Sequence, residues 1–330
     1  MNETESIITV NDLSRHFGEH KAVNHLNLSV TKGEIFGLVG PDGAGKTTTL
    51  RLLAGIMRPT AGTATVANFD VRENPEAIKS LIGYMAQQFS LYGDLTVMEN
   101  LRFFADIYHV SAAERKQRIP RLLHFSRLER FTKRRAGQLS GGMQKKLGLA
   151  CTLIHEPELI YLDEPTTGVD PVSRREFWDI LGDLHLAGIS IVVCTPYMDE
   201  AERCSRVGLM YQGKLIVCDT PEQVKGMVEG DLIELRPDNI RRAHALLADL
   251  PGVLEVQTYG DLIHVFVQDA EAGQATVTQA LEEAGIATSG LRQTHPRMEE
   301  AFISLIRRQG MADEAAEALL NGLQTNSKEE

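Results

Sequence analysis

The 330-residue sequence predicts an α/β domain with a helical insert, followed by a small α+β domain. A compact apolar run at residues 34–39 is followed by Gly40 and leads directly into a glycine-rich loop and a helix, which is typical of a buried parallel strand. Helical periodicity then dominates residues 90–157, and strand patterns return after them. Beyond residue 220, the order strand, helix, strand, strand, helix, strand favours a ferredoxin-like arrangement.

The first domain is expected to span residues 1–220. Strands are predicted at residues 7–10, 26–30, 34–39, 159–162, 189–194 and 207–211, and helices at residues 46–56, 97–108, 112–123 and 142–154. The last three helices form the insert, a helical subdomain at about residues 90–157. One α/β sheet interrupted by this subdomain is the simplest account of the pattern.

The second domain is expected at residues 221–310. Its predicted strands are residues 231–235, 253–258, 261–267 and 288–292, and its predicted helices are residues 240–250, 270–284 and 298–308. Tyr259 and Gly260 mark a hairpin turn between the second and third strands. The tail at residues 311–330 is rich in alanine and acidic residues and is predicted to be flexible.

Composition limits the class of protein. The net charge of −11 disfavours binding to nucleic acid, so no nucleic-acid partner is expected. The longest apolar runs are much shorter than the roughly 20 residues that cross a bilayer, and the acidic, polar N-terminus does not resemble a signal peptide. The four cysteines form no CxxC pair and are expected to be unreactive thiols in a reducing cytosol.

A glycine-rich loop joins the strand at residues 34–39 to the helix that begins at Lys46. The loop and first turn read Gly40, Pro41, Asp42, Gly43, Ala44, Gly45, Lys46, Thr47 and Thr48. Glycines let backbone amides curl around phosphates, Lys46 adds a cation at the β- and γ-phosphates, and the Thr47 hydroxyl can ligate Mg²⁺. An ordinary glycine-rich turn is the alternative, but the position between strand and helix favours a P-loop that binds ATP and Mg²⁺.

Two carboxylates end the apolar strand at residues 159–162. Asp163 stands where a buried strand can deliver a Mg²⁺ ligand. Glu164 follows it and is placed to orient or deprotonate the attacking water. A strand could end in acidic residues by chance, but beside a P-loop these residues predict the second half of an ATPase site.

A third motif lies between these two and opens a helix. It reads Leu139, Ser140, Gly141, Gly142, Met143 and Gln144, and a turn of this kind at a helix N-terminus can bind phosphate. In this order and position it resembles the signature of ABC proteins, LSGGQ, with Met143 at the last of the five places. The resemblance covers residues 6 to about 220. It implies a P-loop ABC ATPase core in which Ser140, Gly141 and Gly142 contact the nucleotide.

Further segments match the same family. Phe17 stands where ABC proteins place an aromatic ring that stacks on adenine. Gln87 resembles the Q-loop glutamine near Mg²⁺ and the attacking water, although Gln88 is a rival for that role. Residues 166–170 resemble the D-loop, which crosses between two subunits in the family, and Asp170 is therefore expected near the nucleotide. A core aromatic, a surface amide or a plain turn would explain each feature singly, but not all of them together.

The sequence departs from the family at one place. ABC proteins carry a switch histidine after the strand that corresponds to residues 189–194, and here Pro196 occupies its position. Proline has no side-chain donor, so it cannot contact a γ-phosphate. Two hypotheses stay open: an active ATPase with Glu164, Gln87 and Lys46 as catalytic residues, or a degenerate ATP-binding subunit that needs a histidine-bearing ATPase partner.

The resemblance also implies partners. ABC subunits form head-to-tail homodimers or heterodimers and drive multi-span membrane permeases, which places the chain at the cytoplasmic face of a membrane. Residues 89–100 and the C-terminal domain resemble the exporter branch whose permeases are separate chains and whose cargoes are drugs, lipids and polysaccharides.

Two further interpretations concern a rival class and a basic cluster. A non-transport ABC protein is the less favoured reading, because the chain has one ATP domain, closely spaced motifs and acidic charge. The basic cluster Lys133, Arg134 and Arg135 is interpreted as a solvated face.

Overall fold

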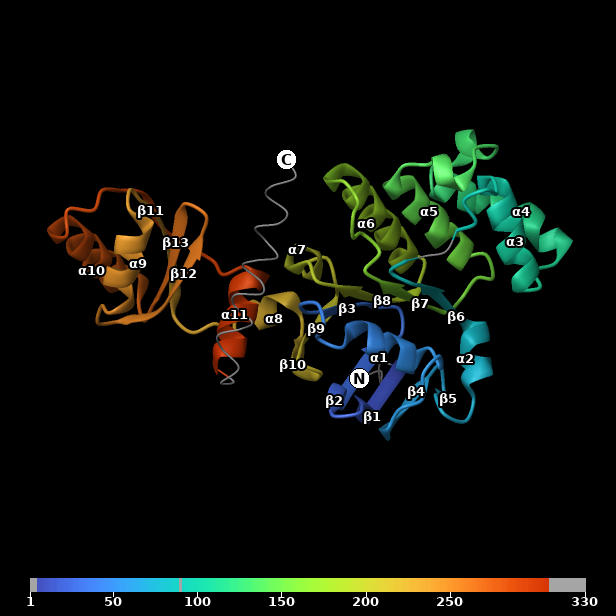
Figure 1. The fold of residues 1–330 in the computed structure, drawn as a ribbon, viewed down its shortest axis with the longest axis horizontal. Coiled ribbons are helices and arrows are strands. Elements are labelled where there is room, and N and C mark those ends of the chain that lie inside the picture. Colours follow the sequence, from blue (N-terminus) through green and yellow to red (C-terminus); the bar gives the residue numbers. More distant parts are fainter. Residues whose placement is uncertain (1–4, 89–90, 309–330) are drawn as a thin grey trace. The chain divides into compact units, whose positions relative to one another are not determined.

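The computed structural model describes residues 5–88 and 91–308, which divide into two compact units (Figure 1). The first unit ends at Pro221 and the second begins at Glu222, beside the boundary that the sequence predicts at residue 220. The predicted flexible tail at residues 311–330 lies outside the described residues. Within the described ranges, no helix is both long enough and apolar enough to span a bilayer.

A six-stranded sheet forms the centre of the first unit. Its strands, in spatial order, are β10 (Lys214–Asp219), β9 (Arg206–Tyr211), β3 (Ile35–Val39), β8 (Ser190–Thr195), β7 (Leu159–Asp163) and β6 (Ile82–Met85). All pairs are parallel except the one between β10 and β9. Every residue of β3, β7 and β8 is buried, as expected for parallel strands that are covered on both faces.

A separate antiparallel sheet was not foreseen from the sequence. Its order is β2 (His20–Thr31), β1 (Ser6–Phe17), β4 (Ala61–Val66) and β5 (Phe69–Asp70). The sequence predicts only residues 7–10 of β1, because the residues after Val10 are typical of a turn, and only residues 26–30 of β2. Asp12 instead takes a positive φ of 52° at a register shift, so the strand continues through a bulge. Helix α1 (Lys46–Leu53) packs between this sheet and the six-stranded one.

The helical subdomain is inserted between β6 and β7, which pair directly in the sheet. It contains α3 (Val97–Ile107), α4 (Ala112–Phe125), α5 (Gly141–Thr152) and short 3-10 helices at Glu129–Phe131 and Ala136–Gln138. Thr96 and Ser111 are the N-cap residues of the first two helices, and each forms a capping box. Three helices of the first unit were not predicted: α2 (Pro75–Leu81), α6 (Pro171–Leu186) and α7 (Met198–Ala201). Helix α6 lies on the opposite side of the six-stranded sheet from α1 (Figure 1).

The second unit has the predicted ferredoxin-like order. Its elements are α8 (Pro221–Lys225, which starts at the boundary), β11 (Asp231–Pro237), α9 (Ile240–Ala248), β12 (Val253–Tyr259), β13 (Leu262–Val267), α10 (Ala270–Glu283), β14 (Thr288–Thr294) and α11 (Met298–Arg308). The four strands form an antiparallel sheet in the order β12-β13-β11-β14. Residues of α9 and α10 share an apolar core with one face of this sheet. On β13, His264 lies 3.0 Å from Glu300 of α11.

Tyr161 lies in the middle of β7 with no exposed surface, and its hydroxyl has no hydrogen-bond partner among the described residues. A buried, unpaired hydroxyl costs about 1–3 kcal/mol. We therefore expect Tyr161→Phe to leave the free energy of unfolding unchanged or to raise it by about 1 kcal/mol. The control Tyr161→Leu also removes ring atoms and should lower it by about 2 kcal/mol. Denaturant titrations followed by circular dichroism measure both, and a clear loss of stability in Tyr161→Phe would contradict the expectation.

Candidate nucleotide site

The candidate site lies at the carboxyl ends of β3, β7 and β8, where three loops begin at the same edge of the sheet. Two backbone hydrogen bonds hold these loops together. The amide of Gly40, at the start of the P-loop, donates to the Thr195 carbonyl at 3.3 Å. The amide of Glu164, after β7, donates to the Cys194 carbonyl at 2.9 Å. The end of β8 is therefore the common anchor of both ATP motifs.

The P-loop backbone requires glycine and presents amide groups. Gly45 has a φ of 104°, and a Cβ atom there would lie 2.2 Å from the Ala22 carbonyl oxygen. Gly43 also has a positive φ, of 77°, and no atom approaches its Cβ position within 4 Å. Helix α1 begins at Lys46 with no side-chain cap and no acidic residue in its first turn. Its first amides are thus available to an anion, which fits a phosphate group.

Lys46 is buried at the base of this loop, with 3% of its surface exposed. Its Nζ donates to the carbonyls of Gly40 at 2.8 Å and Pro41 at 2.9 Å, and lies 3.8 Å from Glu164 Oε1. These bonds hold the ammonium group inside the curve of the loop. A cation there can neutralise phosphate charge.

Thr47 and Asp163 offer the oxygens that Mg²⁺ prefers. Thr47 Oγ1 donates to Asp163 Oδ1 at 2.8 Å, so the hydroxyl and the carboxylate already lie side by side. The other oxygen, Asp163 Oδ2, accepts a hydrogen bond of 3.3 Å from the hydroxyl of Tyr84. Burial and the nearby charge of Asp163 raise the pKa of Tyr84, which keeps this hydroxyl protonated as a donor. The pair therefore fits the metal that the sequence predicts.

Glu164 has the properties of a general base. Its side chain is buried, and its backbone has a φ of 48°, in the left-handed region that non-glycine residues seldom adopt. Burial raises the pKa of Glu164, the Lys46 charge partly offsets that rise, and the Asp42 charge adds to it. A carboxylate whose pKa lies above its ordinary value accepts a proton from water more readily.

Gln87, and not its rival Gln88, reaches this carboxylate. Gln87 Nε2 donates to Glu164 Oε2 at 2.7 Å. The backbone carbonyl of Gln87 in turn accepts a hydrogen bond of 3.0 Å from Lys145 Nζ. Burial lowers the pKa of Lys145, while the charges of Glu164 and Asp163 oppose that effect. Lys145 therefore connects the Q-loop to α5 of the helical subdomain.

Two residues in contact with the site, Lys145 and Tyr84, are not among those that the sequence predicts. Lys145 directly follows the signature motif, so its position was a signal that could have been used. Tyr84 had no such signal, because its contact with Asp163 depends on β6 pairing with β7.

Phe17 lines a hollow of 280 Å³ at the P-loop. The hollow is lined by Phe17, His20, Ala22, Gly43, Ala44, Gly45, Lys46, Thr47, Thr48 and Glu164. The Phe17 side chain is 45% exposed, and the Arg15 guanidinium lies 4.6 Å from the centre of its ring. An exposed ring beside this hollow can stack on a nucleotide base.

Ser140, Gly141, Gly142 and Asp170 do not line the P-loop hollow of the same chain, whereas Thr167 of the D-loop-like segment donates to Glu164 Oε2 at 3.4 Å. Ser140 is exposed and caps α5 by accepting a hydrogen bond of 3.3 Å from the Met143 amide. Gly141 lines a different hollow of 350 Å³, beside Gln87.

Close packing explains the glycine at position 142. A Cβ atom on Gly142 would lie 2.4 Å from Ser173 Cβ, because the start of α5 packs tightly against α6. Asp170 caps α6 by accepting a hydrogen bond of 2.9 Å from the Ser173 amide, which lowers the pKa of Asp170. Within one chain, these residues therefore have structural roles at helix N-termini.

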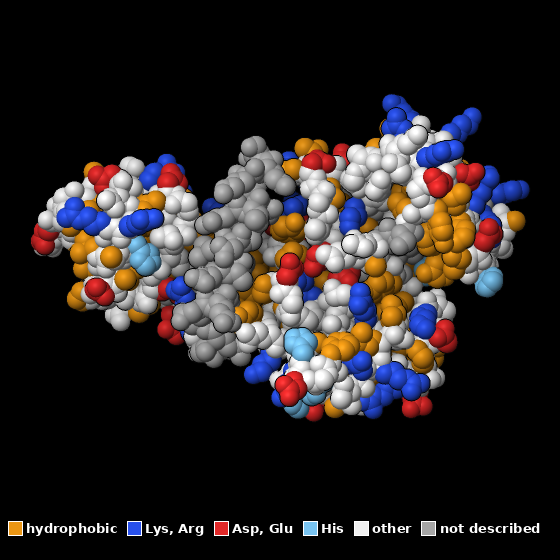
Figure 2. Space-filling view, in the orientation of Figure 1, with side chains coloured by type: hydrophobic (Ala, Val, Ile, Leu, Met, Phe, Trp, Pro, Cys, Tyr) orange, Lys and Arg blue, Asp and Glu red, His pale blue; other side chains and the backbone are white. Residues whose placement is uncertain are grey.

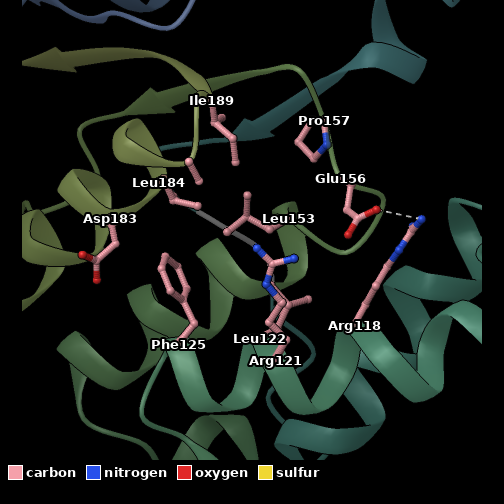
Figure 3. A pocket seen from close by; sticks show the side chains of 11 residues that line it. Arg118, Arg121, Leu122, Phe125, Leu153, Glu156, Pro157, Asp183, Leu184 and Ile189 are labelled. Carbon is pink, nitrogen blue, oxygen red and sulfur yellow. Dashed lines mark ion pairs between the residues drawn. The ribbon is translucent and has the colours of Figure 1, made fainter.

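A separate cavity of 440 Å³ lies between α4 and the C-terminal end of α6 (Figure 3). Phe125, Leu122 and Leu184 contribute to its apolar lining, and an ion pair of 2.9 Å joins Arg118 to Glu156 at its side. None of its lining residues belongs to the ATP motifs.

Two interpretations outside the site can be compared with the structure. The four cysteines are unpaired thiols, and burial raises the pKa of each. Lys133, Arg134 and Arg135 are all exposed, which fits a solvated face and a lipid contact alike.

Comparisons with known proteins agree with the motifs. A family model described as ABC transporter matches residues 23–167. The chain is 40% identical over 321 residues to the probable multidrug ABC transporter ATP-binding protein YbhF of Escherichia coli K12, covering 96% of this chain and 55% of that protein. It therefore spans about half the length of that relative. It is 35% identical over 315 residues to the daunorubicin resistance ATP-binding protein DrrA3 of Streptomyces coeruleorubidus, covering 94% and 99% of the two chains.

A solved structure points the same way. A dimeric ATP-binding cassette in a post-hydrolysis state, bound to ADP and Pi, matches with a TM-score of 0.59 and 26% identity, covering 64% of this chain and 98% of that one. The chain belongs to the family of ABC transporter ATP-binding proteins. Its first unit has the P-loop ABC ATPase fold that the motifs predict.

The pKa of Glu164 gives a test of the site's electrostatics. Because that pKa is raised above 4.5, the basic form of Glu164 develops at higher pH than in an exposed glutamate. Asp42→Asn removes a negative charge that contributes to the rise, so we expect the acid limb of the turnover-against-pH curve to move to lower pH. Asp42→Glu keeps the charge and is the matched control. An unchanged acid limb in Asp42→Asn would show that Glu164 does not control it.

Proposed function

We propose that this chain binds MgATP at its P-loop and hydrolyses it to power export through a separate membrane permease. The observation that carries the proposal is the convergence of Lys46, Thr47, Asp163, Glu164 and Gln87, each linked to the next by a contact of 3.8 Å or less or by adjacency in sequence. Family membership supports ATP as the nucleotide.

Each residue has a distinct role in this proposal. Lys46 and the amides of α1 bind the β- and γ-phosphates, and Thr47 and Asp163, together with Gln87, hold Mg²⁺, which neutralises developing phosphate charge. Glu164 orients or deprotonates the attacking water, with Gln87 holding its carboxylate in place. Phe17 stacks on the adenine ring.

We propose that the ATP site is completed by a second ABC ATPase, in a homodimer or a heterodimer. Ser140 and Gly141 of the signature motif are exposed, and neither they nor Asp170 line the P-loop hollow of their own chain. The signature motif and Asp170 would instead contact the nucleotide of the partner subunit. The solved cassette to which the chain is similar is dimeric. Residues 1–220 would form this ATPase domain, and residues 221–310 an accessory domain.

An apolar face on the helical subdomain supports a membrane permease as the further partner. Tyr92 and Ile107 are about half exposed, and Phe103 packs edge-on against Tyr92 with ring centres 4.4 Å apart. Hydrophobic side chains gather over this subdomain in Figure 2. Such a face can bind a cytoplasmic loop of a permease, which would hold the chain at the cytoplasmic side of the membrane. The relatives' names, multidrug and daunorubicin resistance, favour export as the direction.

Glu164→Gln tests hydrolysis directly. It keeps the size of the side chain and removes the base, so we expect turnover to fall by a factor on the order of 10²–10³ while ATP binding is retained. Steady-state phosphate release and equilibrium binding of a fluorescent ATP analogue measure the two quantities. Glu158→Gln, the same change at the exposed residue before β7, is the matched control. Equal turnover in wild type and Glu164→Gln would overturn the assignment.

Pro196 favours the second candidate, a degenerate subunit that needs a histidine-bearing ATPase partner. Pro196→His restores the missing donor at the end of β8. We expect it to raise kcat with little change in ATP affinity, because a γ-phosphate donor acts mainly on the transition state. If the wild-type chain turns over ATP only after a second ABC ATPase is added, the chain is the degenerate subunit. If it turns over ATP alone, it is the active ATPase.

A further inference from the structure

Glu200 is a buried carboxylate that has no role in the proposed chemistry. It lies in α7, which follows β8, and only 1% of its surface is exposed. The Thr166 hydroxyl donates to Glu200 Oε1 at 2.6 Å, and the Thr195 hydroxyl donates to Glu200 Oε2 at 2.7 Å. Arg174 Nε, on α6, lies 3.8 Å from Oε1. A buried carboxylate is unfavourable unless it is hydrogen-bonded and near a cation, and this one meets both conditions.

The two threonines belong to the two segments that flank the candidate base. Thr166 begins the D-loop-like segment that follows Glu164. Thr195 ends β8, and its carbonyl accepts the hydrogen bond from the Gly40 amide of the P-loop. Its neighbour Cys194 accepts the one from the Glu164 amide. Glu200 therefore joins the D-loop-like segment to the strand end on which both ATP motifs are anchored.

The same network fixes the chain at the position of the missing histidine. The Tyr197 amide donates to Thr195 Oγ1 at 3.1 Å, which links the residues on either side of Pro196. The same hydroxyl donates to Glu200. The Arg174 guanidinium lies 4.1 Å from the centre of the Tyr197 ring. Pro196 offers no side-chain donor, so these contacts of Thr195 and Tyr197 are what order the segment after β8.

We propose that Glu200 is a positioning residue that clamps residues 164–170 and 194–197 together, so that Glu164 is held in register with the P-loop. The proposal rests on the proposed ATPase function of the site. Glu164 needs such support because its left-handed backbone conformation persists only where the surroundings impose it. Glu200 contacts no residue that lines the P-loop hollow, so the clamp should affect turnover more than ATP binding.

Matched threonine variants test the clamp by kinetics. Thr166→Val and Thr195→Val keep the side-chain shape but remove the hydroxyl, whereas Thr166→Ser and Thr195→Ser keep the hydroxyl. We expect kcat to fall about tenfold to a hundredfold in the valine variants, with KM for ATP nearly unchanged, and to stay close to wild type in the serine variants. Valine and serine variants that turn over equally would overturn the proposal, as would equal losses in kcat and ATP affinity.

A double variant tests whether Glu200 and Thr166 act as one unit. In a Glu200→Gln background, Thr166→Val should add little to the loss, because residues of one network are not additive. Fully additive effects on kcat would contradict the clamp.

Hydrogen exchange tests the clamp independently of turnover. In Glu200→Gln, residues 164–170 and 194–197 should exchange faster together, while the helices of the second unit stay protected as in wild type. Faster exchange in only one segment, or in neither, would overturn the clamp even if the wild-type chain hydrolyses no ATP. Absence of wild-type turnover with the expected exchange pattern would instead count against the proposed ATPase function alone.

Discussion

The parallel pairing of β3, β8 and β7 is the constraint on which the candidate site depends. Because parallel strands end at one edge of a sheet, the P-loop, the carboxylates after β7 and the segment after β8 start next to one another. Hydrogen bonds from the Gly40 and Glu164 amides to the last residues of β8 then set their separation. Because these backbones lie close together, the side chains form direct hydrogen bonds: Thr47 donates to Asp163, and Gln87 donates to Glu164.

The charges buried in this site are unfavourable for folding but favourable for its chemistry. Lys46, Asp163 and Glu164 are nearly withdrawn from solvent, and each is held by backbone carbonyls, a hydroxyl or an amide. The same burial raises the pKa of Glu164 and strengthens electrostatic interactions with any phosphate that enters. Buried charges that would destabilise an ordinary core thus suit a site that binds an anion and accepts a proton.

The segment after β8 stays ordered although Pro196 stands at the position of the family's switch histidine. A proline after β8 removes a side-chain donor and a backbone N–H, yet the neighbouring Thr195 and Tyr197 keep the bend ordered through Thr195 Oγ1. Glu200 extends that order to Thr166, two residues after the candidate base Glu164. The segment after β8 therefore keeps its structural connection to the site although the histidine of the family is absent.

The sequence by itself determined the P-loop, the carboxylates Asp163 and Glu164, the signature motif and the order of elements from β11 to α11 in the second unit. Each of these is a local pattern, and its chemistry follows from residues that are close in the chain. Only the tertiary structure distinguished Gln87 from Gln88, brought Tyr84 to Asp163, paired β4 with β1 and β5 with β4, and joined Glu200 to Thr166. Those contacts depend on strand register and on loops that close over long stretches of chain, and no local spacing encodes them.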